Sequence, residues 1–211
     1  MALEARLAAG GGTRVICAGN SGTLAALLGC NITKECSGLI SFGVAGGLSP
    51  HLRTGSCIVG SAILSDYTSF MTDRNWSHSL LEAMPRAVYG IILGVPAPIA
   101  RSETKRRLHV ETGAVAVDTE SHVVARVAAA RGLPMVAIRV ITDSALQSLP
   151  QAALVAMRPD GKIDLVSMIR HIMKDRRELP MLLRTGFDAL GGLAVLLRGR
   201  QLVGPRFSLP D

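Results

Sequence analysis

The sequence is poor in the residues on which several classes of protein depend. Aromatic residues make up 3% of its 211 residues, charged residues make up 18%, and there are only four cysteines. So few aromatic side chains disfavour base stacking on single-stranded nucleic acid, and no basic cluster is interleaved with them, so we expect no nucleic-acid partner. No apolar stretch reaches about 18 residues, so we predict no membrane-spanning segment. The N-terminus lacks the features of a signal peptide, which makes the cytoplasm the default location.

The cysteines and histidines show no metal-ligand spacing. Cys17, Cys30, Cys36 and Cys57 lie in or beside apolar runs and include no Cys-x-x-Cys pair. We therefore predict reduced core residues rather than a zinc site or disulfides. We expect neither a metal nor a cofactor, with phosphate left open as a co-substrate.

The residues that are abundant indicate a folded α/β domain. Hydrophobic residues make up 48% of the chain, with 22 glycines and 10 prolines, and the formal charge is +7. This length and composition predict a single domain over residues 1–211, with a helical part from about residue 149. Continuous apolar runs indicate strands that are covered on both faces, in a central, mostly parallel or mixed twisted sheet with helices on both faces. The net charge allows a phosphate-bearing or membrane-surface partner.

Short apolar runs and turn residues predict the elements. The predicted strands cover residues 14–18, 37–42, 57–64, 88–93, 114–117 and 135–138. The predicted helices cover residues 23–28, 76–83, 101–112, 121–131, 149–157, 163–174 and 179–197. Gly132 and Pro134 end the fourth of these helices.

The most informative segment places acidic residues on both sides of one helix. Asp118-Thr119-Glu120 follows one apolar run, and Arg139 and Asp143 close the next. A strand, a helix and a strand of this length predict a βαβ unit with parallel strands. Glu120, Arg139 and Asp143 are then expected to meet at one sheet edge, where open α/β folds bind ligands.

Each of these residues also has a structural interpretation. Asp143 could cap a helix, and Glu120 could occupy the first turn of its helix. Arg139 is harder to explain in this way, because a buried guanidinium needs an anionic partner. His122 is interpreted as a structural or rim histidine. The run Gly43-Val44-Ala45-Gly46-Gly47 could be an ordinary tight turn, or a turn whose backbone approaches an anion or a sugar.

Taken together, these motifs resemble the purine nucleoside phosphorylase and nucleosidase superfamily. The glycine-rich run, the acidic cluster and the segment Arg139 to Asp143 occur in the order found in that family. The closest similarity is to the hopanoid-associated phosphorylase group. It is carried by the segments 40–48, 117–122 and 157–164, and it extends over essentially the whole chain.

The resemblance implies cleavage of a purine N-glycosidic bond. Asp143 would act as the general acid on the base, and Glu120 would hold the ribose hydroxyls. Arg139 would orient a carboxylate or bind the nucleophile, and Glu4, in a Met-x-x-Glu segment, would activate water. The other implied substrate contacts come from residues of the glycine-rich run and of the two loops near it: Gly43, Val44, Ala45, Gly46, Ile99 and Thr119.

Three departures from the family pattern affect the details. A strand precedes the Met-x-x-Glu segment in these families but not here, so either the first strand is missing or the true start lies upstream. Val44 stands where methylthioadenosine nucleosidases carry serine, which removes a polar contact to the nucleophile. The segment ending at Ile99 lies where those enzymes stack a phenylalanine on adenine, so base binding would rely on aliphatic and backbone contacts.

The resemblance also suggests partners. The hopanoid group implies adenosylhopane, a C35 triterpenoid that carries adenosine, as the substrate. Basic, apolar C-terminal helices are compatible with contact to the inner membrane, although an ordinary packed helix with a solvated basic face explains them equally well. A homodimer is a family-level expectation. The alternatives are a nucleosidase or phosphorylase of small nucleosides such as methylthioadenosine, and a non-catalytic nucleoside- or lipid-binding protein.

Overall fold

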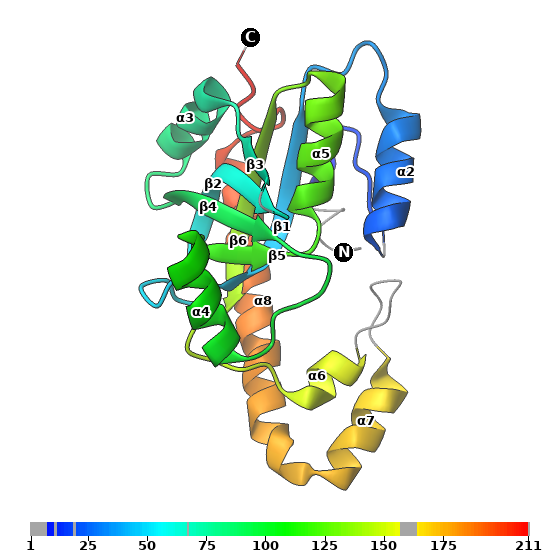
Figure 1. Ribbon diagram of the computed structural model, residues 1–211, viewed down its shortest axis with the longest axis vertical. Helices are drawn as coiled ribbons and strands as arrows, with labels where there is room; N and C mark the ends of the chain where they lie inside the picture. Colours follow the sequence, from blue (N-terminus) through cyan, green and yellow to red (C-terminus); the bar gives the residue numbers. More distant parts are fainter. Residues whose placement is uncertain (1–7, 11, 19, 67, 157–163, 211) are drawn as a thin grey trace.

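The computed structural model describes residues 8–10, 12–18, 20–66, 68–156 and 164–210. Within these residues six strands form one sheet (Figure 1). The strands are β1 (Leu39–Gly47), β2 (Cys57–Ser65), β3 (Thr68–Met71), β4 (Val88–Gly94), β5 (Ala116–Asp118) and β6 (Met135–Asp143). The helices are α2 (Ser21–Asn31), α3 (Arg74–Ala83), α4 (Ser102–Thr112), α5 (Ser121–Arg131), α6 (Gln151–Ala156), α7 (Leu165–Lys174), the 3-10 turn η1 (Arg176–Glu178) and α8 (Leu179–Leu202).

The sheet is mixed and partly closed. Its strand order is β3-β2-β4-β5-β1-β6, and β6 pairs in addition with β2. Strands β2, β4 and β5 run in one direction, and β1 and β6 run in the other. The predicted single-domain α/β fold with a mixed sheet is therefore confirmed.

The prediction that β5 and β6 are parallel is wrong. β1 lies between them, antiparallel to β5 and parallel to β6. The crossover rule fixes the hand of a connection between parallel strands, but it does not require strands on either side of a helix to be parallel. Their carboxyl ends nevertheless come together, because Gly46 of β1 pairs with both Val117 and Asp143.

Helices cover the sheet on different sides (Figure 1). α2 and α5 pack on one large core that includes Leu28, Val124 and Ile141. α3 and the residues after α8 pack on a second core, where the Trp76 indole N–H donates to the carbonyl of Phe207 at 2.7 Å. Apolar residues beside α4 form a third, smaller core.

Local sequence explains the ends of the helices. The Asn20 side chain accepts a hydrogen bond from the backbone N–H of Thr23 at 2.8 Å and so caps α2. α5 has the predicted bounds and ends at Gly132, which adopts a left-handed conformation with φ +63°.

Several predicted elements differ from the structure. Residues 14–18 form no strand, β3 was not predicted, and the glycine-rich run 43–47 continues strand β1 instead of turning. The small residues there are accommodated as strand because β5 and β6 lie close on either side. Cys17 and Cys30 are exposed, so the prediction of core residues is wrong for these two cysteines. Cys36 and Cys57 are half-buried and pack against the two larger cores.

The C-terminal helices form a protrusion. In Figure 1, α6, α7 and the first half of α8 extend below the sheet, whereas the second half of α8 lies behind it. Arg176–Leu202 form a helix that is, by length and composition alone, long and apolar enough to cross a membrane. The sequence alone predicts no such segment, because charged residues interrupt its apolar runs. Its second half packs on β6, where Gly192 lies so close to Thr142 that a methyl group would not fit.

Candidate functional site

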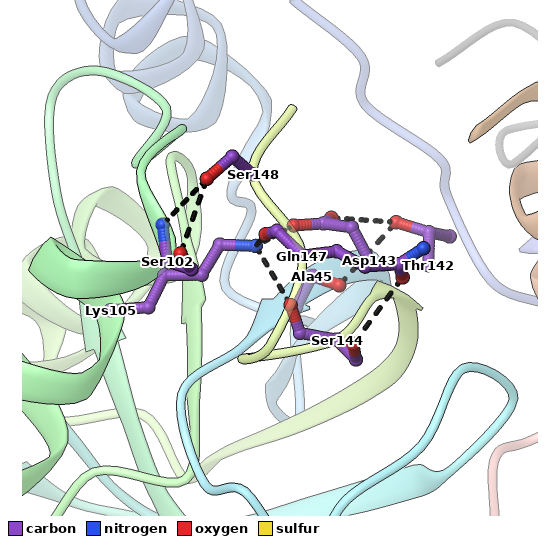
Figure 2. Close-up of polar contacts among 8 residues, drawn as sticks. All are labelled: Ala45, Ser102, Lys105, Thr142, Asp143, Ser144, Gln147 and Ser148. Carbon is purple, nitrogen blue, oxygen red and sulfur yellow. Dashed lines mark hydrogen bonds and ion pairs between the residues drawn. The ribbon is translucent and has the colours of Figure 1, made fainter. Parts of the chain in front are cut away.

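The candidate site centres on Asp143, the last residue of β6. Figure 2 shows its carboxylate beside Lys105, which reaches across from α4. The Lys105 Nζ donates to Asp143 Oδ2 at 2.5 Å, to the carbonyl of Ser144 at 3.0 Å and to the carbonyl of Gln147 at 2.9 Å. The Lys105 side chain is 0% exposed and that of Asp143 is 15% exposed. Asp143 caps no helix, because the next helix, α6, begins only at Gln151.

Burial and charge act in opposite directions on Asp143. Burial raises the pKa of its carboxyl above the ordinary value, and this effect is the larger one. The Lys105 ammonium, through its charge and its hydrogen bond, lowers the same pKa, as does the Thr142 hydroxyl. The net result is a raised pKa, which favours a carboxyl that can hold a proton and release it.

Strand β1 passes directly beside this carboxylate. A methyl group on Gly46 would lie 3.1 Å from Asp143 Oδ2 and 3.4 Å from a methyl carbon of Val117. The Thr142 hydroxyl contacts the carbonyl of Ala45 at 3.4 Å, which further fixes the end of β6 against β1. The glycine is therefore required by close approach between the strands.

A second ion pair lies inside the sheet. The Arg139 Nε donates to Asp118 Oδ2, one Nη donates to Ser41 Oγ at 2.6 Å, and the other donates to the carbonyl of Ile138 at 3.0 Å. The Arg139 and Asp118 side chains are 2% and 5% exposed. All three guanidinium nitrogens are thus used inside the protein. Of the two predicted roles for Arg139, the geometry favours orienting a carboxylate over binding a nucleophile.

That carboxylate organises the turn that carries Glu120. Asp118 Oδ1 accepts hydrogen bonds from the backbone N–H of Glu120 at 3.2 Å, and from the N–H and hydroxyl of Ser121 at 3.0 and 2.7 Å. Glu120 is half-buried at the start of α5. The carbonyl of Thr119 accepts from the Ser21 hydroxyl at 3.3 Å. Arg139 therefore acts on Glu120 indirectly, through Asp118.

The remaining predicted residues surround this arrangement. Gly43 pairs with Arg139, and Val44 and Ala45 follow it in β1. Ile99, half-buried in the connection before α4, packs on the small core that contains Val117. Glu4 lies outside the described residues.

His122 has the structural environment predicted for it. It is 5% exposed at the start of α5, and its Nδ1 has no hydrogen-bond partner among the residues that the structure describes. Burial lowers its pKa, while the charge of Asp118 raises it by a smaller amount. Its Cβ lies so close to Gly94 that a methyl group there would come within 2.4 Å. These contacts identify a neutral, packed side chain.

Two surface hollows lie away from Asp143. One, of about 340 Å³, is lined by residues from β3, α5 and the start of β6, and another follows the exposed side of α4. Neither contains Asp143, Glu120 or Arg139 among its lining residues. The site is therefore defined by the side-chain geometry rather than by these hollows.

Lys105 was not predicted to belong to the site. It is followed by Arg106 and Arg107, both exposed, so composition alone does not distinguish it from a solvated charge. The available signal is helical spacing, since Lys105 shares a face with the half-buried Leu108 and Thr112, three and seven residues further on. Asp118 was recognised as part of the acidic cluster but not as the partner of Arg139.

The α/β fold with its mixed sheet, together with a family comparison, defines the class of this protein as the phosphorylase superfamily. Residues 11–160 match the model of the phosphorylase superfamily, and the chain belongs to this family. No curated protein sequence matches the chain.

Solved structures with the same fold include proteins named as nucleosidases and as a hydrolase. The methylthioadenosine/S-adenosylhomocysteine nucleosidase of Campylobacter jejuni is 17% identical with a TM-score of 0.56, over 85% of this chain and 77% of that one. A putative methylthioadenosine nucleosidase of Weissella paramesenteroides is 16% identical with a TM-score of 0.57, over 87% and 75%. A futalosine hydrolase mutant of Helicobacter pylori is 19% identical with a TM-score of 0.54, over 59% and 66%. At these identities the similarity establishes the fold.

Proposed function

We propose that this protein cleaves the N-glycosidic bond of a purine nucleoside and that Asp143 is the general acid. The observation that carries the proposal is a nearly buried carboxyl at the end of β6 whose pKa is raised by burial. Cleavage leaves negative charge on the departing base, and a carboxyl whose pKa is raised keeps its proton to higher pH and can transfer it to N7. Glu120, on the turn fixed by Asp118, would hold the ribose hydroxyls and stabilise the positive sugar.

The nucleophile is proposed to be water. Arg139 is already bonded to Asp118, Ser41 and a carbonyl, which argues against its serving as a phosphate ligand. Glu4 is proposed to activate the water on the basis of the Met-x-x-Glu resemblance. Base release that is equal with and without added phosphate is the expected result, and strict dependence on phosphate would identify a phosphorylase.

The substrate is proposed to be a lipid-linked nucleoside, adenosylhopane. The surface of α7 and α8 supports this choice. Val166, Ile169 and Met173 are exposed on α7 at spacings of three and four residues, and Leu179, Leu183, Phe187 and Leu190 are exposed on α8 at similar spacings. Phe187 is 73% exposed and Met173 72%. A patch of this kind on a protein marks an interaction surface.

Exposed basic residues occur on the same helices as these apolar residues. The exposed ones on α7, η1 and α8 are Arg170, Lys174, Arg176, Arg177, Arg184 and Arg198. Arg200 is different, because it is buried over the ring of Phe207 and donates to the carbonyls of Gly204 and Pro205. Apolar and basic side chains together suit the headgroup region of an anionic membrane, so we propose peripheral contact with the inner membrane, where a lipid substrate is present.

The first experiment measures adenine released from adenosylhopane and from methylthioadenosine. We expect wild type to release adenine from adenosylhopane. In Asp143→Asn the rate of release should decrease by about 10²–10⁴-fold, as expected for loss of a general acid. Asp66→Asn is the matched control, because it makes the same change at a side chain that is 76% exposed, and it should keep full activity. Full activity in Asp143→Asn would remove this residue from the chemistry.

Methylthioadenosine is the second candidate substrate, favoured by the names of the structural relatives. Release from methylthioadenosine alone would select it and remove the lipid-linked proposal. Nucleoside binding without base release would instead indicate a non-catalytic binding protein.

Co-sedimentation with vesicles tests the membrane contact. Binding to vesicles that contain anionic phospholipid, weakened by Phe187→Ser and by salt, is expected. A stable homodimer that covers α7 and α8 and does not bind vesicles would assign this face to a second copy of the chain.

A further inference from the structure

Lys105 is the one buried residue of α4, a helix whose other residues are half-buried or exposed. Its side chain is 0% exposed, whereas the neighbouring Arg106 and Arg107 are exposed. An ammonium group has three hydrogens, and the three acceptors at 2.5, 3.0 and 2.9 Å use all of them. A buried charge is costly unless it is paired, so such complete bonding indicates that the lysine is fixed in one position.

The position of Lys105 makes the two oxygens of Asp143 different. Oδ2 accepts a hydrogen bond from the lysine, whereas in the described part of the chain Oδ1 accepts one from the Thr142 hydroxyl at 3.3 Å. Each element packed near the carboxyl contributes differently to its charge environment. α4 brings Lys105, α8 brings Asp188, whose negative charge raises the pKa of Asp143, and β1 brings the uncharged Gly46. Lys105 is thus the cation that stabilises the ionised form among the groups that act on this carboxyl.

We propose that Lys105 is a positioning residue for the general acid, holding Asp143 by Oδ2 and stabilising the carboxylate that remains after proton transfer. This inference rests on the proposed function of Asp143. In the step, the O–H bond of Asp143 breaks and its proton goes to N7 of the purine. The bond between the sugar carbon and the base nitrogen breaks at the same time, and its electron pair stays on the base. Lys105 keeps its own protons throughout, and the new carboxylate forms against its positive charge.

The arrangement has a consequence for the pH dependence of the reaction. A general acid is active only while protonated, so base release decreases as pH rises through the pKa of Asp143. Lys105 lowers that pKa, and after its removal burial is opposed only by the hydrogen bond from the Thr142 hydroxyl. The basic limb of the profile should then move to higher pH, while the maximal rate decreases because the product carboxylate loses its cation.

The experiment compares pH profiles of kcat and kcat/KM in the full chain for wild type, Lys105→Met and Arg106→Met. Lys105→Met should lower kcat at least about tenfold and move the basic limb up by about 1–3 pH units, the range typical of a neighbouring opposite charge. Arg106→Met removes an exposed charge from the adjacent position and should match wild type. Lys105→Arg restores a positive charge and should return the limb toward its wild-type position.

Some outcomes would overturn the inference. A basic limb that stays in place in Lys105→Met, with a loss no greater than in Arg106→Met, would show that the lysine only supports the fold. If Lys105→Met does not fold, Lys105→Gln replaces it, because glutamine can still donate to the two carbonyls. Its basic limb should move to higher pH in the same way, and an unmoved basic limb would refute the inference.

A direct titration separates this inference from the proposed function. If wild type releases no base from either nucleoside, the proposed function fails. The pairing is then tested by ¹³C NMR of aspartate carboxyls, with Asp143→Asn to assign the signal. An Asp143 signal that titrates at higher pH in Lys105→Met than in wild type supports the pairing, and an unchanged titration refutes it.

Discussion

The ion pair between Asp118 and Arg139 should be one of the most sensitive points of the fold. Both side chains are almost fully buried, and Asp118 also fixes the turn at Glu120 and Ser121. Asp118→Asn keeps the shape of the side chain but leaves the guanidinium without a counter-charge. Removing one partner of a buried pair typically costs about 3–5 kcal/mol. For a chain of this size this corresponds to a decrease in Tm of about 6–20 °C, at about 2–4 °C per kcal/mol.

The matched control is an exposed ion pair in the same protein. Asp66 pairs with Arg126, and these side chains are 76% and 51% exposed. Asp66→Asn should therefore change the free energy of unfolding by no more than about 1 kcal/mol, as exposed pairs do. Urea unfolding followed by circular dichroism measures both variants. Equal, small effects would refute the argument that burial makes the Asp118 pair important.

Two further predictions concern the contact between α5 and β4 and the packing of α8. Because burial lowers the pKa of His122, the unfolded chain takes up a proton below about pH 6.5 that the folded chain takes up only at lower pH. The free energy of unfolding should therefore decrease as pH falls from 7 to 5, and a slope that is unchanged in His122→Gln would contradict this. Gly94→Ala would place a methyl group 2.4 Å from the Cβ of His122 and should destabilise the protein by about 1–3 kcal/mol. Gly186 lies in α8 with open space around it, so Gly186→Ala should stabilise the protein by about 0.5–1 kcal/mol. Equal Tm values for the two variants would contradict the packing argument.

The sequence predicted local structure well where a pattern repeats and a stop signal follows. The helix 121–131 has its predicted bounds because Gly132 provides the left-handed end. The strands at 57 and 88 were also found, since continuous apolar runs mark buried strands. Pairing between distant segments was not predictable in this way. β5 and β6 run in opposite directions because β1, the strand between them, is antiparallel to β5 and parallel to β6, and no feature of their own residues specifies that neighbour.

The candidate site was predictable in its residues but not in its connections. Arg139 was expected to need an anionic partner, and Asp118 is that partner. Lys105 was missed because its neighbours are also basic and its burial depends on where α4 lies against the end of β6. Glycine is common in turns, so the sequence predicts a turn for the glycine-rich run, whereas in the structure this run allows strand β1 to approach Asp143. Such close approaches depend on the tertiary structure.

Closure of the strands has a consequence for behaviour at high concentration. Among the described strands, only β3 pairs with a single neighbour, because β6 returns to β2. Unpaired strand edges can recruit other chains into aggregates, and proteins limit this by keeping such edges short. β3 has only four residues. Folded copies therefore expose few unpaired strand backbone groups to one another. Aggregation by extension of the β-sheet should require the closed ring of strands to open first.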